Sequence, residues 1–235
     1  MTKEISFSAV VALTARTLLP MIFASSIQAA EPTEPGASTV IAFGACAHED
    51  RPQPIWDAVV AAKPDLFIFA GDNIYADTND MAVMKAKYAK LAAQPGYQKL
   101  LKTCPVLATW DDHDFGVNDG GKDYPEKKEA ARICLDFFGV PKDDPRRTRD
   151  GIYGSQVIGE KGKRVQIILL DTRYFRDDLD RYKRGEARPG NIVGWYKPTK
   201  DTSRTLLGEH QWKWLEEELK KPAEVRVIVS SIQVV

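Results

Sequence analysis

Short apolar runs alternate with segments of helical periodicity along the first two thirds of the chain. Three apolar runs have the length of buried strands, namely 39–43, 65–70 and 105–109. Three further segments have helical patterns, namely 54–62, 81–101 and 126–138. Pro95 predicts a break within the second helical segment. Strands that alternate with helices predict an α/β fold with a mostly parallel, buried sheet.

The last third of the chain has a mixed pattern. Residues 152–158 and 164–170 indicate two adjacent strands around a hairpin-like turn. Residues 206–220 predict an amphipathic helix, and 225–230 predict another buried strand. Between the second of these strands and the helix, 172–204 is a long polar loop. Loops of this length in compact domains are mostly functional or mobile.

The first 38 residues read as a processing region. Lys3 and Arg16 precede an apolar run at 17–27 that small residues follow, so 1–30 is predicted to be a secretory signal peptide. A disordered or helical extension is the alternative. The apolar run is shorter than the about 20 residues that a membrane span needs, so no transmembrane anchor is expected after cleavage. Residues 31–38 are predicted to be a linker, and the mature protein to be periplasmic or secreted.

Composition excludes several classes of protein. The 235 residues are 43% hydrophobic and 28% charged, which is typical of a globular domain. The formal net charge is zero, and no nucleic-acid-binding module is expected. No glycine-rich nucleotide motif follows any predicted strand. Three cysteines do not form a disulfide scaffold; Cys104 and Cys134 are predicted to be structural, with pairing as the alternative.

Chemically active side chains gather where the first three strands end. In open α/β sheets, ligands bind at the carboxyl ends of the strands. The three segments that follow these strands contain cysteine, histidine, tyrosine and many acidic residues: 44–50, 71–77 and 110–119. Such a concentration at three strand ends favours a metal site.

The donor types predict two cations. Asp72 follows a strand end and is expected to bridge them. Cys46 as thiolate and Tyr75 as phenolate favour a ferric or similar ion on one side. Asp112, with the neutral oxygen of Asn118, suits calcium or magnesium on the other.

His113 is the candidate catalytic residue, because a protonated imidazole beside carboxylates can bind an anionic substrate or protonate a leaving group. Further residues are candidates for orienting these ligands or contacting substrate: His48, Asn73, Asp111, Asp114 and Arg173. Structural readings remain open for several of them. Asp72 and Asp112 are also common types at helix caps and turns, and Arg173 is as well suited to a structural salt bridge.

The same motifs resemble a known family. Gly-Asp-Asn-Ile-Tyr at 71–75 and Trp-Asp-Asp-His-Asp at 110–114 are similar to the PhoD-like (alkaline phosphatase D) branch of the calcineurin-like metallophosphatases. Cys-Ala-His at 46–48 stands at that superfamily's first motif, with cysteine for aspartate as in this branch. The segments 170–174 and 206–212 also resemble the branch, so the resemblance runs from Thr39 to the last residue.

This resemblance implies an αββα sandwich that hydrolyses phosphate esters with a hydroxide activated by a dinuclear centre, expected to be Fe³⁺ with Ca²⁺ or another divalent pair. The expected substrate is a small phosphate ester. The family continues into a late Gly-Asp-x-His segment, so 39–235 is expected to be the N-terminal part of such a domain, with the sandwich incomplete at its C-terminus and with reduced or no activity. The alternative is a non-catalytic metal- or phosphate-binding remnant. The oligomeric state is not predicted.

Overall fold

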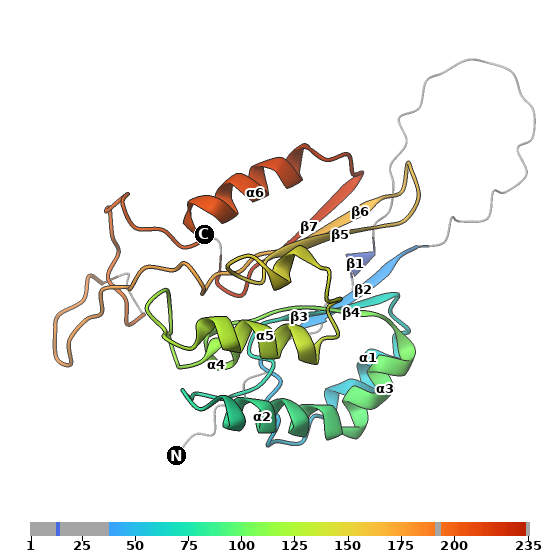
Figure 1. Cartoon of the computed structure of the whole chain (residues 1–235), viewed down its shortest axis with the longest axis horizontal. Helices are drawn as coiled ribbons and strands as arrows, with labels where there is room; N and C mark the ends of the chain where they lie inside the picture. Colours follow the sequence, from blue (N-terminus) through green and yellow to red (C-terminus); the bar gives the residue numbers. More distant parts are fainter. Residues whose placement is uncertain (1–12, 15–37, 191–193, 234–235) are drawn as a thin grey trace, which may run out of the picture.

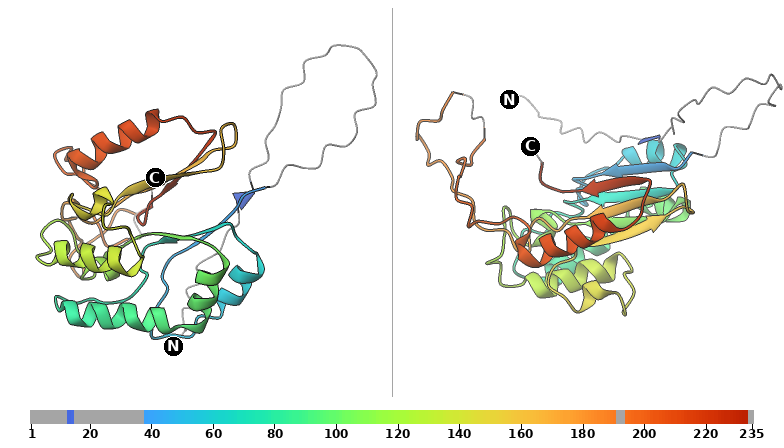
Figure 2. Two further views of the ribbon diagram at one scale, coloured as in Figure 1. Left: turned by 45° about the vertical axis from the view of Figure 1, so that its right-hand side comes forward. Right: turned by 90° about the horizontal axis from the view of Figure 1, so that it is seen from above.

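Two β-sheets packed face to face form the centre of the molecule, and helices cover the outer face of each (Figure 1, Figure 2). The computed structural model describes residues 13–14, 38–190 and 194–233. The layers therefore follow the order helix, sheet, sheet, helix. This arrangement confirms the predicted αββα sandwich.

The first sheet contains the three strands predicted in the first half of the chain. Its strands, in spatial order, are β1 (Leu13–Thr14), β2 (Val40–Gly44), β3 (Leu66–Ala70) and β4 (Val106–Thr109). The pairs β2–β3 and β3–β4 are parallel, and β1 is antiparallel to β2. Because β2, β3 and β4 run in the same direction, their carboxyl ends lie at one edge of the sheet.

Four helices follow these strands and pack on one face of the first sheet. They are α1 (Ile55–Ala61), α2 (Met81–Ala93), α3 (Pro95–Thr103) and α5 (Lys127–Phe137). The predicted break at Pro95 is confirmed: Gln94 has an extended backbone between α2 and α3. Two short elements were not predicted, namely α4 (Asp112–Phe115) and the 3₁₀ turn η1 (Pro145–Arg147).

The second sheet consists of β5 (Gly154–Ile158), β6 (Val165–Leu169) and β7 (Val225–Val229). The predicted β5–β6 hairpin is antiparallel, whereas β6 and β7 are parallel. Helix α6 (Gly208–Lys220) packs on this sheet. Three of the five strand pairs are thus parallel, as a mixed and mostly parallel fold requires.

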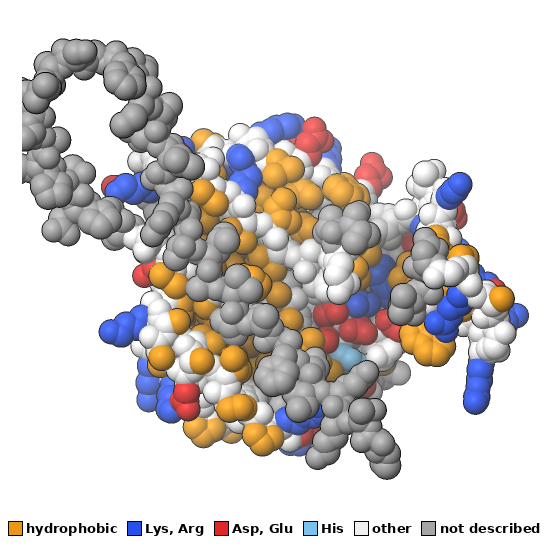
Figure 3. All heavy atoms as spheres, turned by 180° about the vertical axis from the view of Figure 1, so that it is seen from behind, with side chains coloured by type: hydrophobic (Ala, Val, Ile, Leu, Met, Phe, Trp, Pro, Cys, Tyr) orange, Lys and Arg blue, Asp and Glu red, His pale blue; other side chains and the backbone are white. Residues whose placement is uncertain are grey.

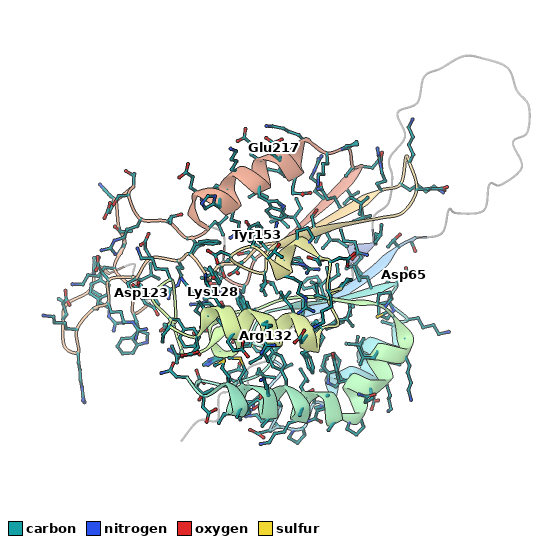
Figure 4. All side chains as sticks on the ribbon, in the orientation of Figure 1. Asp65, Asp123, Lys128, Arg132, Tyr153 and Glu217 are labelled. Atoms are coloured by element: carbon teal, nitrogen blue, oxygen red, sulfur yellow. The ribbon has the colours of Figure 1, made fainter. Side chains whose placement is uncertain are left out.

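Aliphatic side chains join the two sheets, and aromatic rings join the first sheet to its helices. Ile41, Leu66 and Ile68 pack against Ile167 and Leu169 of the second sheet. Burying each such side chain contributes about 1.5–3 kcal/mol. On the other face of the first sheet, the clustered rings belong to Trp56, Phe67, Phe69, Tyr97 and Phe138. Charged side chains lie on the outer faces of the helices, for example those of Lys128 and Arg132 on α5 and of Glu217 on α6 (Figure 4).

The predicted signal peptide (1–30) and linker (31–38) lie outside the described residues, apart from strand β1 and Ser38, so both stay predictions. In the described part of the chain, no helix has the length and apolar character needed to cross a membrane. The segment 172–204 is the predicted long loop. Its one regular feature among described residues is an antiparallel bridge between Arg181 and Tyr196.

Gly96 allows α3 to pack closely against Trp56. A Cβ at position 96 would lie 2.5 Å from Cδ1 of this buried ring. We predict that Gly96→Ala lowers the free energy of unfolding by about 1–3 kcal/mol, because overpacking outweighs the gain in helix propensity of about 0.5–1 kcal/mol. Urea denaturation checks this. Gly190→Ala is the control, because its Cβ would meet no atom of the described residues within 4 Å. Equal stability of the two variants would contradict the prediction.

Candidate metal centre

The loops after β2 and β3 are joined through their backbones. Cys46 N donates to Gly71 O at 3.1 Å, and Ala47 N donates to Asp72 O at 2.9 Å. These bonds continue the parallel pairing of the two strands beyond their ends. The first two candidate ligands, Cys46 and Asp72, are therefore held side by side.

Both of these ligands have a left-handed backbone, which turns the chain sharply at the strand ends. The φ angles are 62° at Cys46 and 51° at Asp72. Gly71, before Asp72, has a φ of 118°, and a Cβ there would lie 2.7 Å from Cβ of Asp111. Only glycine fits this position, because both the conformation and the close approach exclude a side chain.

A thiol and a phenol converge on one carboxylate oxygen. Cys46 Sγ lies 3.5 Å from Asp72 Oδ2, and Tyr75 Oη lies 3.4 Å from the same atom. Partial burial raises the pKa of the Cys46 thiol, while a hydrogen bond with Tyr75 opposes the shift. Burial and the thiol also raise the pKa of Tyr75. Both groups therefore hold their protons here, and a cation that binds them would have to displace those protons.

The ring of Tyr75 lies between two imidazoles. His48 stacks on it with ring centroids 4.6 Å apart and an angle of 13° between the planes, and the His113 centroid lies at 4.3 Å. The backbone N–H of Tyr75 donates to the buried carboxylate of Glu49 at 2.9 Å. These contacts fix the direction in which the phenol points.

Asp72, Asp112 and His113 bring one ligand atom each within 4.8 Å of one another. Figure 3 shows acidic side chains gathered beside a histidine on this face of the molecule, with basic side chains next to them. Asp72 Oδ1 is buried and accepts no hydrogen bond from the described residues. Burial and the carboxylates of Asp111 and Asp112 raise the pKa of Asp72 to about 6. An unpaired buried oxygen in this negative environment fits a bound cation.

Asp112 and Asn118 are linked to each other through Asp119. Asp112 Oδ2 accepts the backbone N–H of Asp119 at 2.6 Å, and Arg173 lies 3.6 Å from Oδ1. Burial raises the pKa of Asp112, but the Asp119 N–H, Arg173 and His113 lower it by more. The net shift is downward, so the carboxylate stays charged. Asn118 is exposed, and its amide donates to Asp119 Oδ2 at 3.0 Å. Its role as a ligand stays a prediction.

His113 is held by Asp77, at 2.8 Å from Nδ1 to each carboxylate oxygen. Burial lowers the pKa of His113, but the hydrogen bond to Asp77 and the charges of Asp72 and Asp112 outweigh it, so the net shift is upward. This environment favours the imidazolium form, as the proposed acid role requires.

Asp114 is fully buried and holds the loops together. Its carboxylate accepts the backbone N–H groups of Asp72 at 3.2 Å, Asn73 at 3.1 Å and Asp111 at 2.7 Å. The Asn73 amide also donates to it at 2.6 Å. Burial and the charge of Asp72 raise the pKa of Asp114, and the N–H donors oppose that shift. Asp114 therefore shapes the loop, and the Asn73 amide nitrogen ties it to Asp114 and to Thr109 O, while Asn73 Oδ1 is buried without a hydrogen-bond partner among the described residues.

Arg173 is paired with Asp111, as the salt-bridge reading of the sequence proposed. Its Nε donates to Asp111 Oδ1 at 2.6 Å, and Ser231 donates to the same oxygen at 2.8 Å. The guanidinium is buried and lies near Asp112 as well. Arg173 thus offsets the charge of two neighbouring acids.

Sequence reasoning assigned no role to Glu49 or Asp77. Both follow strand ends, and that position was the signal that could have identified them. Glu49 belongs to a second group of possible metal ligands, together with His48 and Asp50. Lys87 Nζ already lies 2.5 Å from the carboxylates of both Glu49 and Asp50. This group therefore fits a cation less well than the one around Asp72.

A family model of PhoD-like phosphatases matches residues 41–234. The chain belongs to the PhoD-like phosphatase family. The motifs that carried the resemblance lie within this match, both those at the three strand ends and the segments 170–174 and 206–212. The predicted membership is therefore confirmed.

A solved structure of PhoD shares the fold of this PhoD-like chain, with a TM-score of 0.59 and 22% sequence identity. The alignment covers 80% of this chain and 40% of that one, so the chain spans less than half the length of the protein it matches. No curated protein matches the sequence.

We predict that Asp114→Asn abolishes metal binding. The amide nitrogen of asparagine cannot accept a hydrogen bond from the backbone N–H groups, so the turn that contains Asp72 would no longer be held in place. The loss of charged hydrogen bonds should also lower the free energy of unfolding by about 3 kcal/mol. Asp171→Asn is the matched control. Asp171 is also fully buried, and it accepts N–H groups of Trp110, Ile152 and Tyr174.

Metal content after dialysis and urea denaturation check both variants. Similar destabilisation with metal retained only in Asp171→Asn is expected. Equal retention of metal by the two variants would show that Asp114 does not hold the site.

Proposed function

We propose that this chain is a metal-dependent phosphoesterase of the alkaline phosphatase/phosphodiesterase type, which hydrolyses small phosphate esters with a metal-activated hydroxide. One observation carries the proposal. The thiol of Cys46, the phenol of Tyr75 and a carboxylate oxygen of Asp72 converge, and Asp112 and His113 lie beside them. The thiol, the phenol and the two carboxylates suit two cations of different hardness.

In this proposal, Cys46, Tyr75 and Asp72 would hold Fe³⁺, while Asp72, Asp112 and Asn118 would hold Ca²⁺ or another divalent ion. Such a pair would polarise a phosphoryl group and supply hydroxide at neutral pH. Asp72 would serve both cations, because its Oδ2 faces the thiol and phenol while its Oδ1 has no hydrogen-bond partner among the described residues.

The chain's own residues supply the proton transfer. His113, whose protonated form is favoured by Asp77 and the nearby acids, donates a proton to the leaving-group oxygen. Asp77 holds the ring through Nδ1, so Nε2 is the nitrogen available to substrate. Arg173 stays on Asp111 and keeps this acid from repelling an anionic substrate.

We further propose that the protein acts in the periplasm or outside the cell. The support is the basic and apolar pattern of residues 1–30, which is that of a signal peptide. Mass spectrometry of the secreted or periplasmic fraction would detect a mature N-terminus near Ala29 or Ala30.

The function is tested by metal analysis together with hydrolysis of p-nitrophenyl phosphate and bis(p-nitrophenyl) phosphate. We predict that Asp72→Asn reduces hydrolysis at least about 100-fold and lowers the content of both metals. Asp57→Asn is the control, because it removes the same charge at a position that is 76% exposed and paired with Lys99. Chelation should abolish hydrolysis, and added metal should restore it.

Three results distinguish the readings. Bound metal with hydrolysis that depends on Asp72 supports the proposal. Bound metal or phosphate without turnover would favour the non-catalytic alternative. Absence of both metal and hydrolysis, in this chain and in any longer form, would contradict both readings.

A further inference from the structure

Two arginines of the segment 172–204 hold the loop that contains Asn118 and Asp119. The side chain of Arg181 forms an ion pair with the Asp119 carboxylate. Arg176, which is buried, donates to the backbone carbonyls of Asp119 and Gly120. The loop of one metal half-site thus depends on a segment about sixty positions further along the chain.

Arg181 projects from a short ribbon within that segment. Arg181 and Tyr196 form an antiparallel bridge, Tyr182 N donates to Trp195 O at 2.9 Å, and Lys197 N donates to Asp180 O at 2.7 Å. The Arg181 guanidinium also donates to the Tyr196 hydroxyl at 3.2 Å. The backbone pairing therefore fixes where the guanidinium meets Asp119.

Asp119 in turn orients both predicted ligands of the harder cation. Its backbone N–H donates to Asp112 Oδ2 at 2.6 Å, and its carboxylate accepts the Asn118 amide at 3.0 Å. Because the amide nitrogen of Asn118 is directed to Asp119, its carbonyl oxygen is the atom that it can offer to a cation. Asp119 has a φ of 57°, a conformation that costs free energy in any residue but glycine, so the contacts that hold it matter.

We propose that Arg181 is a positioning residue for the Asp112–Asn118 half of the metal centre. It acts through Asp119 and couples divalent-cation binding to the attachment of the ribbon formed by residues 180–182 and 195–197. This inference rests on the proposed function, because it assumes that a divalent cation binds to Asp112. By linkage, a cation that requires the attached loop also stabilises the attached ribbon.

The charge of Arg181 and its positioning role predict opposite changes in calcium affinity when the residue is replaced. A guanidinium repels a nearby cation, so loss of its charge alone would strengthen calcium binding. If Arg181 positions the loop, its loss weakens calcium binding despite the removed repulsion. The sign of the change in affinity therefore separates the two effects.

The experiment is calorimetric titration of the full chain with calcium chloride, comparing Arg181→Met with Arg184→Met. Arg184 belongs to the same segment, but it is exposed and forms no ion pair among the described residues. Both variants lose one positive charge. We expect about fivefold weaker calcium binding in Arg181→Met, the scale of one exposed ion pair, and unchanged or tighter binding in Arg184→Met.

A double-mutant cycle shows whether Arg181 acts through Asp119. In an Asp119→Asn background, Arg181→Met should cause little further loss of calcium affinity. Thermal unfolding without calcium should be the same for both arginine variants, because the Arg181 side chain is 53% exposed.

Calcium binding in Arg181→Met that equals or exceeds that in Arg184→Met would overturn the inference. A full additional loss in the Asp119→Asn background would overturn it as well. Absence of calcium binding by the unmodified chain would instead contradict the cation site of the proposed function, on which the inference rests.

Discussion

The buried carboxylate of Asp114 is the interaction on which the candidate site depends. It gathers N–H donors from the turn after β3 and from the residue that follows Trp110, so two strand ends are fixed by one side chain. A carboxylate in this position is stabilised by several hydrogen bonds, and its removal would leave all of its N–H donors without an acceptor. The turn can then keep Asp72 in a left-handed conformation beside Cys46.

The same arrangement accumulates negative charge that the protein only partly offsets. Arg173 offsets the charge of Asp111, and Asp77 favours the positively charged form of His113, but Asp72 faces the thiol and the phenol with one oxygen unpaired among the described residues. Burial of like charges is unfavourable unless a cation shares them. The electrostatics of the site, like its residue types, therefore favour a bound cation.

The sequence predicted those parts of the structure that depend on local pattern. Cys46, Asp72 and Asp112 were predicted as ligands because they follow the ends of predicted strands. The helix break at Pro95 was predicted because proline disrupts a helix interior. The contacts between Asp77 and His113, and between Arg181 and Asp119, join loops 36 and 62 positions apart in the chain. No periodicity specifies the path of such loops, so these partners emerge only once the fold brings them together.

The central claim is that cations bind where three strand ends meet around Asp72. The most direct test is anomalous X-ray diffraction at the iron edge from crystals of the protein loaded with iron and calcium. The account predicts an iron peak in contact with Cys46 Sγ, Tyr75 Oη and a carboxylate oxygen of Asp72. An iron peak at His48, Glu49 and Asp50 instead, or none within reach of Asp72, would contradict it.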